Sequence, residues 1–369
     1  MGERFHGTMM RRALALAKKG VGRTRPNPAV GCVIVRNGEI VGEGWHKKAG
    51  TPHAEIHALH AAGERAAGAD VYVTLEPCSH FGKTPPCADA LITAGVGRVF
   101  VGMIDPNPAV SRRGIEKLIS AGIEVTTGLL EKECQAINRP FIKQMTVGLP
   151  YVTLKSALTL DGKTATAIGD SRWVTGERAR RLVHRMRSTT DAVMVGVGTV
   201  IADDPLLTCR IRGGRDPMRV IVDSSLRLPL SAQVLTLKST SRTVVATISN
   251  DSAKIRELHL LGAEVVICKE KDGQVDLGDL LRQLGKWGVQ SLLLEGGANL
   301  AAAFFREHLI DRCIFFYAPK LVGGEGIGLF TGKGVGMMAE AVPLDDVTIR
   351  RCGDDFMVEG EPKYTCSPA

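Results

Sequence analysis

The sequence predicts two consecutive α/β domains. Its 369 residues exceed the ~250–300 at which a single hydrophobic core stops growing, so two domains are the simplest division. Hydrophobic residues make up 44% of the chain and charged residues 23%, as is typical of globular proteins. Aromatic residues are only 5%, so Val, Ile, Leu and Ala must fill the core. Apolar runs that alternate with helical patterns then favour layered α/β architecture over an aromatic-rich sandwich.

The first domain is expected to hold a mixed sheet covered by helices on both faces. Residues 8–19 show a helical pattern, with Thr8 as N-cap and Gly20 just after its end. Apolar runs at 30–35 and 39–45 flank Asn37-Gly38, the strongest short signal for a β-hairpin. Helices and strands then alternate, with helices expected at 54–66, 86–94, 112–121 and 130–145 and strands at 71–76, 98–103 and 123–127.

The run QMTVGLP interrupts this alternation, and we place the domain boundary there, dividing the chain into 1–147 and 148–369. A new strand begins at Tyr151. Alternation then resumes, with further strands expected near 192–198, 219–224, 243–248, 263–268, 291–297 and 313–319. The second part is therefore predicted to be another α/β domain.

Several classes of protein are disfavoured by composition. No apolar run approaches the ~18–20 residues of a membrane span, and the N-terminus lacks the apolar region of a signal peptide. Nine scattered cysteines do not form a disulfide framework, so we expect a cytoplasmic protein with reduced thiols. The formal charge is +8, mostly from the first domain, without a Lys/Arg-rich run. Such an excess suits nucleic acid or an anionic small substrate equally well.

Three short segments of the first domain supply metal ligands: His53-Ala54-Glu55, Pro77-Cys78, and Cys87. Each is expected where a strand or loop leads into a helix. One imidazole and two thiolates are typical of a catalytic zinc site, because they leave the fourth position open. Zinc deaminases combine H-x-E with P-C-x-x-C, and their Glu shuttles protons without binding the metal. Here eight residues, and not two, separate the cysteines, which argues against a generic nucleoside or nucleic-acid deaminase.

Other interpretations of these residues stay open. His57 and His60 share a helical face with His53 and could form a different metal site, although packed or surface positions fit them better. Cys78 and Cys87 could be ordinary buried thiols. We assign Cys32 and Cys134 to the core.

The segments PNPAVGCVIV, HAEIHAL, TLEPCSHFGKTPPC and DPNP resemble the deaminase half of the bifunctional riboflavin-biosynthesis deaminase/reductase family. KSALTLDGKTA, GDSRWVTG, ADDPLLTCR and EGGAN resemble its reductase half, so the resemblance covers nearly the whole chain. It implies a cytidine-deaminase-like α/β/α domain followed by a domain like dihydrofolate reductase. It also implies two cofactors, Zn²⁺ and NADPH.

For the first domain the resemblance implies hydrolytic deamination of 2,5-diamino-6-ribosylamino-4(3H)-pyrimidinone 5′-phosphate. Glu55 would take the proton from water and deliver it to the departing ammonia. The family correspondence places the base and ribose against Asn27, His46 and His80, and the ribose phosphate against Lys83, Asp105 and Asn107. The Asp-Pro-Asn-Pro run is also strong turn chemistry by itself.

For the second domain the resemblance implies NADPH-dependent reduction of the ribosyl side chain to ribityl. No GxGxxG follows a first strand. The EGGAN run instead predicts a strand-to-helix turn whose free N–H groups suit a pyrophosphate. The implied cofactor contacts are Ala157, Trp173, Thr199, Asp203, Ser224, Gly297, Ala298, Asn299, Leu300, Ala301, Ala302 and Ala303. The implied substrate contacts are Ser171, Arg187, Leu207, Arg210 and Glu295.

We expect Arg187 and Arg210 to hold the ribose phosphate, because guanidinium groups suit its geometry. The acid that assists ring opening is expected to be Lys155 or Asp203, with Glu295 as a third candidate. NADPH should be preferred over NADH, with Ser224 as the recognition point and Arg227 nearby.

The predicted partners are small phosphorylated pyrimidines, without nucleic acid or membrane, and a homo-oligomer, most simply a dimer formed through the reductase domain. Two rival functions stay open. One is a tRNA adenosine or cytidine deaminase with an accessory domain, which the basic first domain would suit. The other is a non-catalytic, zinc-stabilised binding protein, although structural sites normally close the fourth zinc position.

Overall fold

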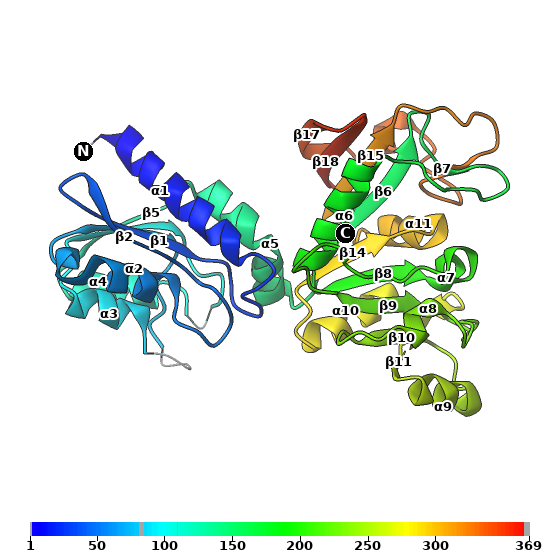
Figure 1. Cartoon of the computed structure of the whole chain (residues 1–369), viewed down its shortest axis with the longest axis horizontal. Helices are drawn as coiled ribbons and strands as arrows, with labels where there is room; N and C mark the ends of the chain where they lie inside the picture. Colours follow the sequence, from blue (N-terminus) through cyan, green and yellow to red (C-terminus); the bar gives the residue numbers. More distant parts are fainter. Residues whose placement is uncertain (1, 81–84, 109, 365–369) are drawn as a thin grey trace. The chain divides into compact units, whose positions relative to one another are not determined.

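The computed structural model describes residues 2–80, 85–108 and 110–364 (Figure 1). The chain divides into two compact units, Met1–Gly148 and Leu149–Ala369. Within the described residues, no helix is long and apolar enough to cross a membrane.

The first unit contains a five-stranded mixed sheet in the order β2-β1-β3-β4-β5. Strand β1 pairs antiparallel with β2 and β3, whereas β3, β4 and β5 are parallel. The strands are β1 (Gly31–Arg36), β2 (Glu39–Trp45), β3 (Asp70–Leu75), β4 (Arg98–Met103) and β5 (Glu124–Thr127). The β1–β2 hairpin turns at Asn37 (φ 52°) and Gly38 (φ 85°), as their sequence predicts.

Helices cover both faces of this sheet. The helices are α1 (Glu3–Ala17), α2 (Ala54–Ala62), α3 (Cys87–Thr93), α4 (Arg113–Ser120) and α5 (Glu131–Val147), and short 3₁₀ turns follow α1 and α2 at Lys18–Gly20 and Gly63–Ala66. α1 and α5 contact each other on one face, and α2, α3 and α4 lie on the other (Figure 1). The expected mixed sheet between helical layers is confirmed.

The start of α1 differs from the sequence prediction. The helix begins at Glu3 with Gly2 as N-cap, and not after Thr8. The Thr8 hydroxyl instead donates to the carbonyl of Arg4 (2.9 Å), one turn back within a continuous helix. Gly20 ends the 3₁₀ turn that extends α1, so it does not directly follow the α-helix.

The second unit contains a nine-stranded sheet in the order β11-β10-β9-β8-β14-β6-β15-β18-β17. The strands from β11 to β15 run parallel, and β18 and β17 are antiparallel to their neighbours. Its strands are β6 (Tyr151–Thr159), β8 (Ala192–Gly196), β9 (Met218–Val222), β10 (Thr243–Thr247), β11 (Ala263–Ile267), β14 (Ser291–Glu295), β15 (Arg312–Ala318), β17 (Leu344–Cys352) and β18 (Asp355–Pro362).

Six helices and two small strand pairs complete the described part of this unit. The helices are α6 (Glu177–Thr189), α7 (Val197–Asp203), α8 (Gln233–Thr236), α9 (Ser252–Leu260), α10 (Leu277–Lys286) and α11 (Ala298–Arg306), with a 3₁₀ turn at Met338–Glu340. The small pairs are β12 (Glu270–Lys271) with β13 (Gln274–Val275), and β7 (Lys163–Ala165) with β16 (Ile327–Gly328). The strand expected at 192–198 ends at Gly196, because Val197 already begins α7.

Candidate active sites

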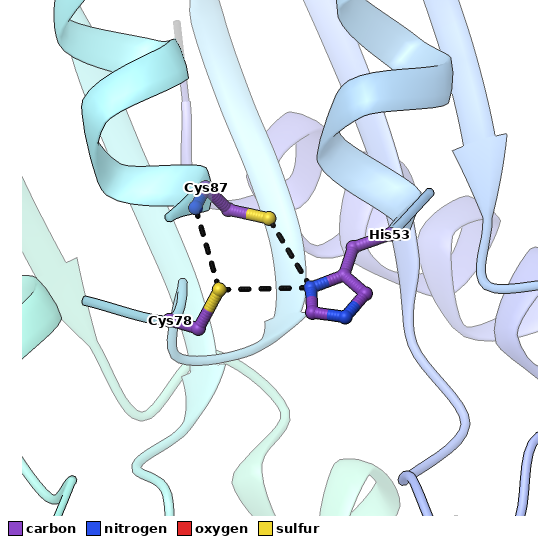
Figure 2. A group of neighbouring side chains, drawn as sticks. All are labelled: His53, Cys78 and Cys87. Carbon is purple, nitrogen blue, oxygen red and sulfur yellow. Dashed lines mark hydrogen bonds between the residues drawn. The ribbon is translucent and has the colours of Figure 1, made fainter. Parts of the chain in front are cut away.

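Three side chains of the first unit converge at the ends of secondary-structure elements (Figure 2). His53 is the N-cap of α2, Cys78 follows β3 by three residues, and Cys87 is the first residue of α3. His53 Nδ1 lies 3.3 Å from Cys87 Sγ and 3.6 Å from Cys78 Sγ. The three ligand atoms all lie within 4.8 Å of one another, so one metal ion could contact all three.

The chemistry of these donors fits zinc. One imidazole nitrogen and two sulfurs are zinc ligands, and three protein ligands leave a position for water or substrate. The backbone N–H of Cys87 donates to Cys78 Sγ (3.3 Å) at the start of α3. The Cys87 thiol, the His53 ring and this N–H together lower the pKa of Cys78 to about 4, which favours the thiolate needed for metal binding.

Two glycines of β2 bring α2 close enough to place His53. A Cβ on Gly44 would lie 2.2 Å from the carbonyl oxygen of Ala54, and one on Gly42 would lie 2.2 Å from that of Ala58. These distances are far below any real contact, so the backbone of α2 lies directly on β2. The GEG run within EIVGEGW therefore allows α2, whose N-cap is His53, to pack directly on β2.

Glu55 lies in the first turn of α2 and is only 3% exposed. Burial raises the pKa of Glu55 to about 7, because the charged carboxylate is poorly solvated there. A carboxyl group with such a pKa exchanges its proton readily near neutral pH, as a proton shuttle requires.

His46 and Asn27 lie beside these residues. The His46 ring packs edge-on against the His53 ring, 5.0 Å between centroids, and its Nε2 lies 3.1 Å from Asn27 Nδ2. Burial lowers the pKa of His46, so its ring is neutral near pH 7. The structure thus brings two of the residues expected to bind the base next to the metal ligands.

Of the residues expected to bind the ribose phosphate, the structure describes Asp105 and Asn107. Asp105 Oδ1 accepts the N–H of Asn107 (2.9 Å), so this run does form the expected turn. Burial and the neighbouring charge of Glu76 raise the pKa of Asp105. The side chain of His80 is exposed. Lys83 lies outside the described residues.

A buried carboxylate that the sequence analysis did not single out shapes this loop. Glu76 is 4% exposed and accepts the backbone N–H groups of Asp105 (3.2 Å), Arg112 (3.0 Å) and Gly114 (3.0 Å). Its place directly before Pro77-Cys78 was the available signal. Glu76 therefore ties the loop after β4 to the segment that carries Cys78.

The other histidines and cysteines considered above do not belong to the group of metal ligands. Among the described residues, the group able to hold a metal consists of His53, Cys78 and Cys87, without His57 or His60. Cys32 and Cys134 are fully buried in the hydrophobic core, as expected.

The second unit contains a cavity of about 1490 Å³ at the carboxyl ends of parallel strands β6, β8, β9 and β14. Most residues expected to bind cofactor or substrate line it: Lys155, Ala157, Ser171, Trp173, Arg187, Thr199, Asp203, Arg210, Ser224, Glu295, Gly297, Ala298, Asn299, Leu300, Ala301 and Ala303. Leu207 and Ala302 are not part of this lining, and both are 2% exposed.

The turn after β14 faces this cavity. Gly296 (φ 72°) and Gly297 (φ 74°) adopt left-handed backbone conformations between β14 and α11, which side chains rarely tolerate. Gly297 is the N-cap of α11, so the first N–H groups of this helix are directed at the cavity end of the turn. This is the geometry that binds phosphate groups at helix N-termini.

Glu295 lies between two cations at the end of β14. Arg187 forms a double hydrogen bond with Glu295 (2.6 and 3.1 Å), and Lys155 Nζ lies 3.0 Å from the same carboxylate. Burial raises the pKa of Glu295, but the charges of Arg187 and Lys155 outweigh it and leave the pKa well below its usual range. Glu295 is therefore an ionised acceptor, which makes this third candidate for the acid a poor one.

Arg187 has further bonds that bear on its expected role. Its Nη1 donates to the carbonyl of Thr208 (3.0 Å) in addition to the bonds with Glu295. A substrate phosphate would therefore meet only the remaining N–H groups of this guanidinium. Arg210 lies beside it, and its backbone N–H donates to His184 Nδ1 (3.3 Å).

Trp173 and Asp203 also line the cavity. Trp173 is 62% exposed, and the guanidinium of Arg180 lies 4.7 Å from the centre of its ring. Asp203 is the last residue of α7, and its carbonyl accepts from Arg172 (2.7 Å). The carboxylate that anchors the following loop belongs to Asp204, which accepts from the backbone and side chain of Gln233.

Several lining residues escaped the sequence analysis. Arg180, Val183 and His184 line the cavity together with Arg187. They precede Arg187 by seven, four and three residues along α6. This spacing was the available signal, since such positions share a helical face. The hairpin β12–β13 and the loop at 329–332 also contribute to the lining. Asp272-Gly273 was the available signal for the hairpin, whereas the loop carries no recognisable motif.

Two protein-family models match the chain. Residues 3–103 match the cytidine and deoxycytidylate deaminase zinc-binding region. Residues 150–358 match the RibD C-terminal domain. One model thus matches within each unit.

Whole-chain relatives are also similar. The riboflavin biosynthesis protein RibD of Actinobacillus pleuropneumoniae is 47% identical over 95% of this chain and 93% of its own. That of Escherichia coli (strain K12) is 44% identical over 94% and 96%. Among solved structures, RibD of Acinetobacter baumannii covers 98% of this chain and all of its own at 40% identity, with a TM-score of 0.89. A diaminohydroxyphosphoribosylaminopyrimidine deaminase/5-amino-6-(5-phosphoribosylamino)uracil reductase from Thermotoga maritima covers 98% and 99% at 38% identity, with a TM-score of 0.87.

Proposed function

Because this chain belongs to the RibD family of bifunctional riboflavin-biosynthesis enzymes, we propose that it catalyses two consecutive reactions at the sites described above. The first is deamination of 2,5-diamino-6-ribosylamino-4(3H)-pyrimidinone 5′-phosphate in the first unit. The second is NADPH-dependent reduction of the ribosyl side chain of 5-amino-6-ribosylaminouracil 5′-phosphate in the second. Zinc and NADPH are the two cofactors.

The observation that carries the deaminase assignment is the group of three converging ligand atoms beside a buried carboxyl. His53, Cys78 and Cys87 would hold the zinc ion. Bound zinc supplies Lewis-acid activation of water near neutral pH. Glu55 lies outside the ligand group, and its raised pKa lets its carboxyl accept a proton and release it later to the leaving ammonia. His46 and Asn27, joined side chain to side chain, would orient the pyrimidine ring.

For the reductase, the large cavity at the carboxyl ends of the sheet supports a dinucleotide site. NADPH supplies the hydride for the sugar carbon. The turn at Gly296-Gly297 and the start of α11 would bind its pyrophosphate. Lys155 is the best-placed acid, because it lines the cavity and Glu295 holds its ammonium in position (3.0 Å). Asp203 remains the second candidate.

The finer assignments made from the sequence remain proposals: a homodimer formed through the reductase unit, and a cytoplasmic location. The tRNA-deaminase rival would require the second unit to be an accessory domain. That unit instead matches the RibD C-terminal domain over residues 150–358. A purely structural zinc site would not need a buried, proton-exchanging Glu55 beside the metal ligands.

The test uses the full chain loaded with zinc. Ammonia release is measured with the diaminopyrimidinone phosphate and, separately, with an RNA hairpin that carries cytidine and adenosine. NADPH oxidation is then followed with the deaminated product. We expect ammonia from the small substrate alone and NADPH oxidation only with the deaminated compound. Ammonia from the RNA, or no NADPH oxidation, would overturn the proposal.

A further inference from the structure

The small hairpin β12–β13 closes one end of the cavity in the second unit. Its turn residues Asp272 (φ 52°) and Gly273 (φ 73°) form a tight two-residue connection between Lys271 and Gln274. All four residues line the cavity, as does Ser224, which follows β9. The hairpin and the end of β9 thus form a common wall of the proposed NADPH site.

The hydroxyl of Ser224 is occupied in holding this hairpin. It donates to Gln274 Oε1 (3.0 Å) and accepts the backbone N–H of Val275 (3.1 Å). A serine hydroxyl has one hydrogen to donate, and a phosphate group needs donors. Ser224 could donate to a phosphate only by releasing Gln274. The observed bonds therefore describe an anchor for the hairpin better than a phosphate ligand.

Lys271 lies on the face of the hairpin that is turned toward Ser224. Lys271 and Gln274 are direct partners across the two strands, and such partners project on the same face about 4.5–5.5 Å apart. Because the Gln274 side chain reaches Ser224, the Lys271 side chain leaves from the same side. Its ammonium is half-exposed and pairs with Glu307 (3.1 Å), which also lines the cavity.

We propose that Lys271, together with Arg227, recognises the 2′-phosphate that distinguishes NADPH from NADH, and that Ser224 positions the hairpin that carries Lys271. This inference rests on the proposed reductase function. Arg227 is exposed, lines the cavity and follows Ser224 by three residues. In this arrangement Lys271 exchanges the single carboxylate of Glu307 for the more highly charged phosphate when the cofactor binds.

The first test measures binding, not turnover, on the full chain by calorimetry. The probes are adenosine 2′,5′-bisphosphate, which carries the 2′-phosphate, and ADP, which does not. Lys271→Gln is expected to weaken binding of the bisphosphate about 10- to 100-fold, as expected for one charge-assisted hydrogen bond, while ADP affinity stays unchanged. Lys271→Arg should retain most of the affinity. Lys269→Gln is the matched control, because Lys269 is exposed, precedes the hairpin and does not line the cavity.

Two further variants separate recognition from simple support of the fold. Glu307→Gln removes the competing carboxylate, so bisphosphate affinity should rise several-fold, a change that a purely structural ion pair would not produce. Ser224→Ala should weaken binding of the bisphosphate more than that of ADP, because the hairpin that carries Lys271 loses its anchor. Two outcomes would overturn the inference. In the first, Ser224→Ala loses the preference for the 2′-phosphate while Lys271→Gln keeps it. In the second, Lys271→Gln weakens the binding of both probes equally.

Failure of this inference is distinguishable from failure of the proposed function. If the wild-type chain prefers the bisphosphate and oxidises NADPH, but Lys271→Gln retains that preference, only the role of Lys271 is wrong. If the wild-type chain binds neither probe and does not oxidise NADPH with the deaminated substrate, the reductase assignment itself is wrong. Steady-state kcat/KM ratios for NADPH and NADH, measured on the same variants, should follow the binding ratios.

Discussion

Two buried carboxyl groups have pKa values that their surroundings shift in opposite directions. Glu55 is 3% exposed and burial raises its pKa to about 7. Glu295 is 4% exposed, yet Arg187 and Lys155 outweigh its burial and lower its pKa. Environments that drive the pKa values of similar groups apart assign them different roles. Glu55 is suited to carry a proton, whereas Glu295 is suited to hold two cations in place.

Glu55→Gln should retain zinc and lose deamination, because Glu55 lies outside the ligand group and acts on protons. We expect a rate loss of about 10²–10⁴-fold, the usual contribution of a general acid–base group. Elemental analysis measures the metal, and NADPH oxidation in the second unit serves as the internal control. Cys87→Ser should instead lose zinc. Loss of the metal in Glu55→Gln would contradict the ligand assignment.

Glu295→Gln should destabilise the second unit, because it leaves Arg187 and Lys155 buried without their shared anion. Removing one partner of a buried ion pair costs about 3–5 kcal/mol, or roughly 6–20 °C in Tm for a unit of this size. The folded-state pKa is lowered, so this stabilisation is present above the unfolded pKa of about 4.3 and is lost only as the pH falls through the folded pKa. Calorimetry at pH 7 should therefore detect it in full.

The control for this prediction is Asp345→Asn, which breaks an exposed pair with Lys363 (3.5 Å). Exposed pairs contribute about 0–1 kcal/mol, so its Tm should hardly change. Similar small shifts in both variants would mean that the Glu295 cluster contributes little to stability.

At the scale of elements, the sequence predicts most of the parallel strands in both units. Six parallel strands of the second unit begin and end within two residues of their expected positions: β8, β9, β10, β11, β14 and β15. Strands buried on both faces leave a continuous hydrophobic signal in the sequence. The metal ligands were equally visible, since a residue type at the end of a strand or the start of a helix is a local feature. His53, Cys78 and Cys87 each occupy such a position.

Other elements leave no comparable signal. Strand β17 exposes every residue from Asp345 to Arg351, so it lacks the apolar alternation by which an edge strand is recognised. The strands β12 and β13 have two residues each, which is too short for any period. The contact between Ser224 and Gln274 joins residues 50 positions apart, so it could not be predicted from either segment alone.

Gly44→Ala should disturb the metal site through the position of α2. Its new Cβ would lie 2.2 Å from the Ala54 carbonyl, so α2 must move and carry His53 with it. We expect a stability loss of about 1–3 kcal/mol, typical of overpacking, and weaker zinc binding in a competition assay. The same substitution at Gly7 is the control, because there the nearest atom is the flexible tip of Arg11 at 3.5 Å. Unchanged zinc affinity in Gly44→Ala would show that α2 position does not determine the site.

At the scale of the whole molecule, the two sites are built from separate parts of the chain. The metal group uses residues before Gly148, and the residues that line the cavity all follow Leu149. A zinc chelator should therefore abolish deamination and leave NADPH oxidation unchanged with the deaminated substrate. Zinc added back should restore ammonia release. Loss of both activities on chelation would mean that the metal also supports the second unit.

The two activities should be separable by cutting the chain at the linker. Each unit has its own sheet and its own hydrophobic core, and a unit with its own core can in principle fold alone. Residues 1–147 should therefore bind zinc and release ammonia, while residues 148–369 should bind NADPH and reduce the deaminated substrate, each at near the rate of the full chain. Metal analysis and the two assays on the purified fragments check this. If both fragments were soluble and folded but inactive, and mixing them restored activity, each site would need residues from the other unit.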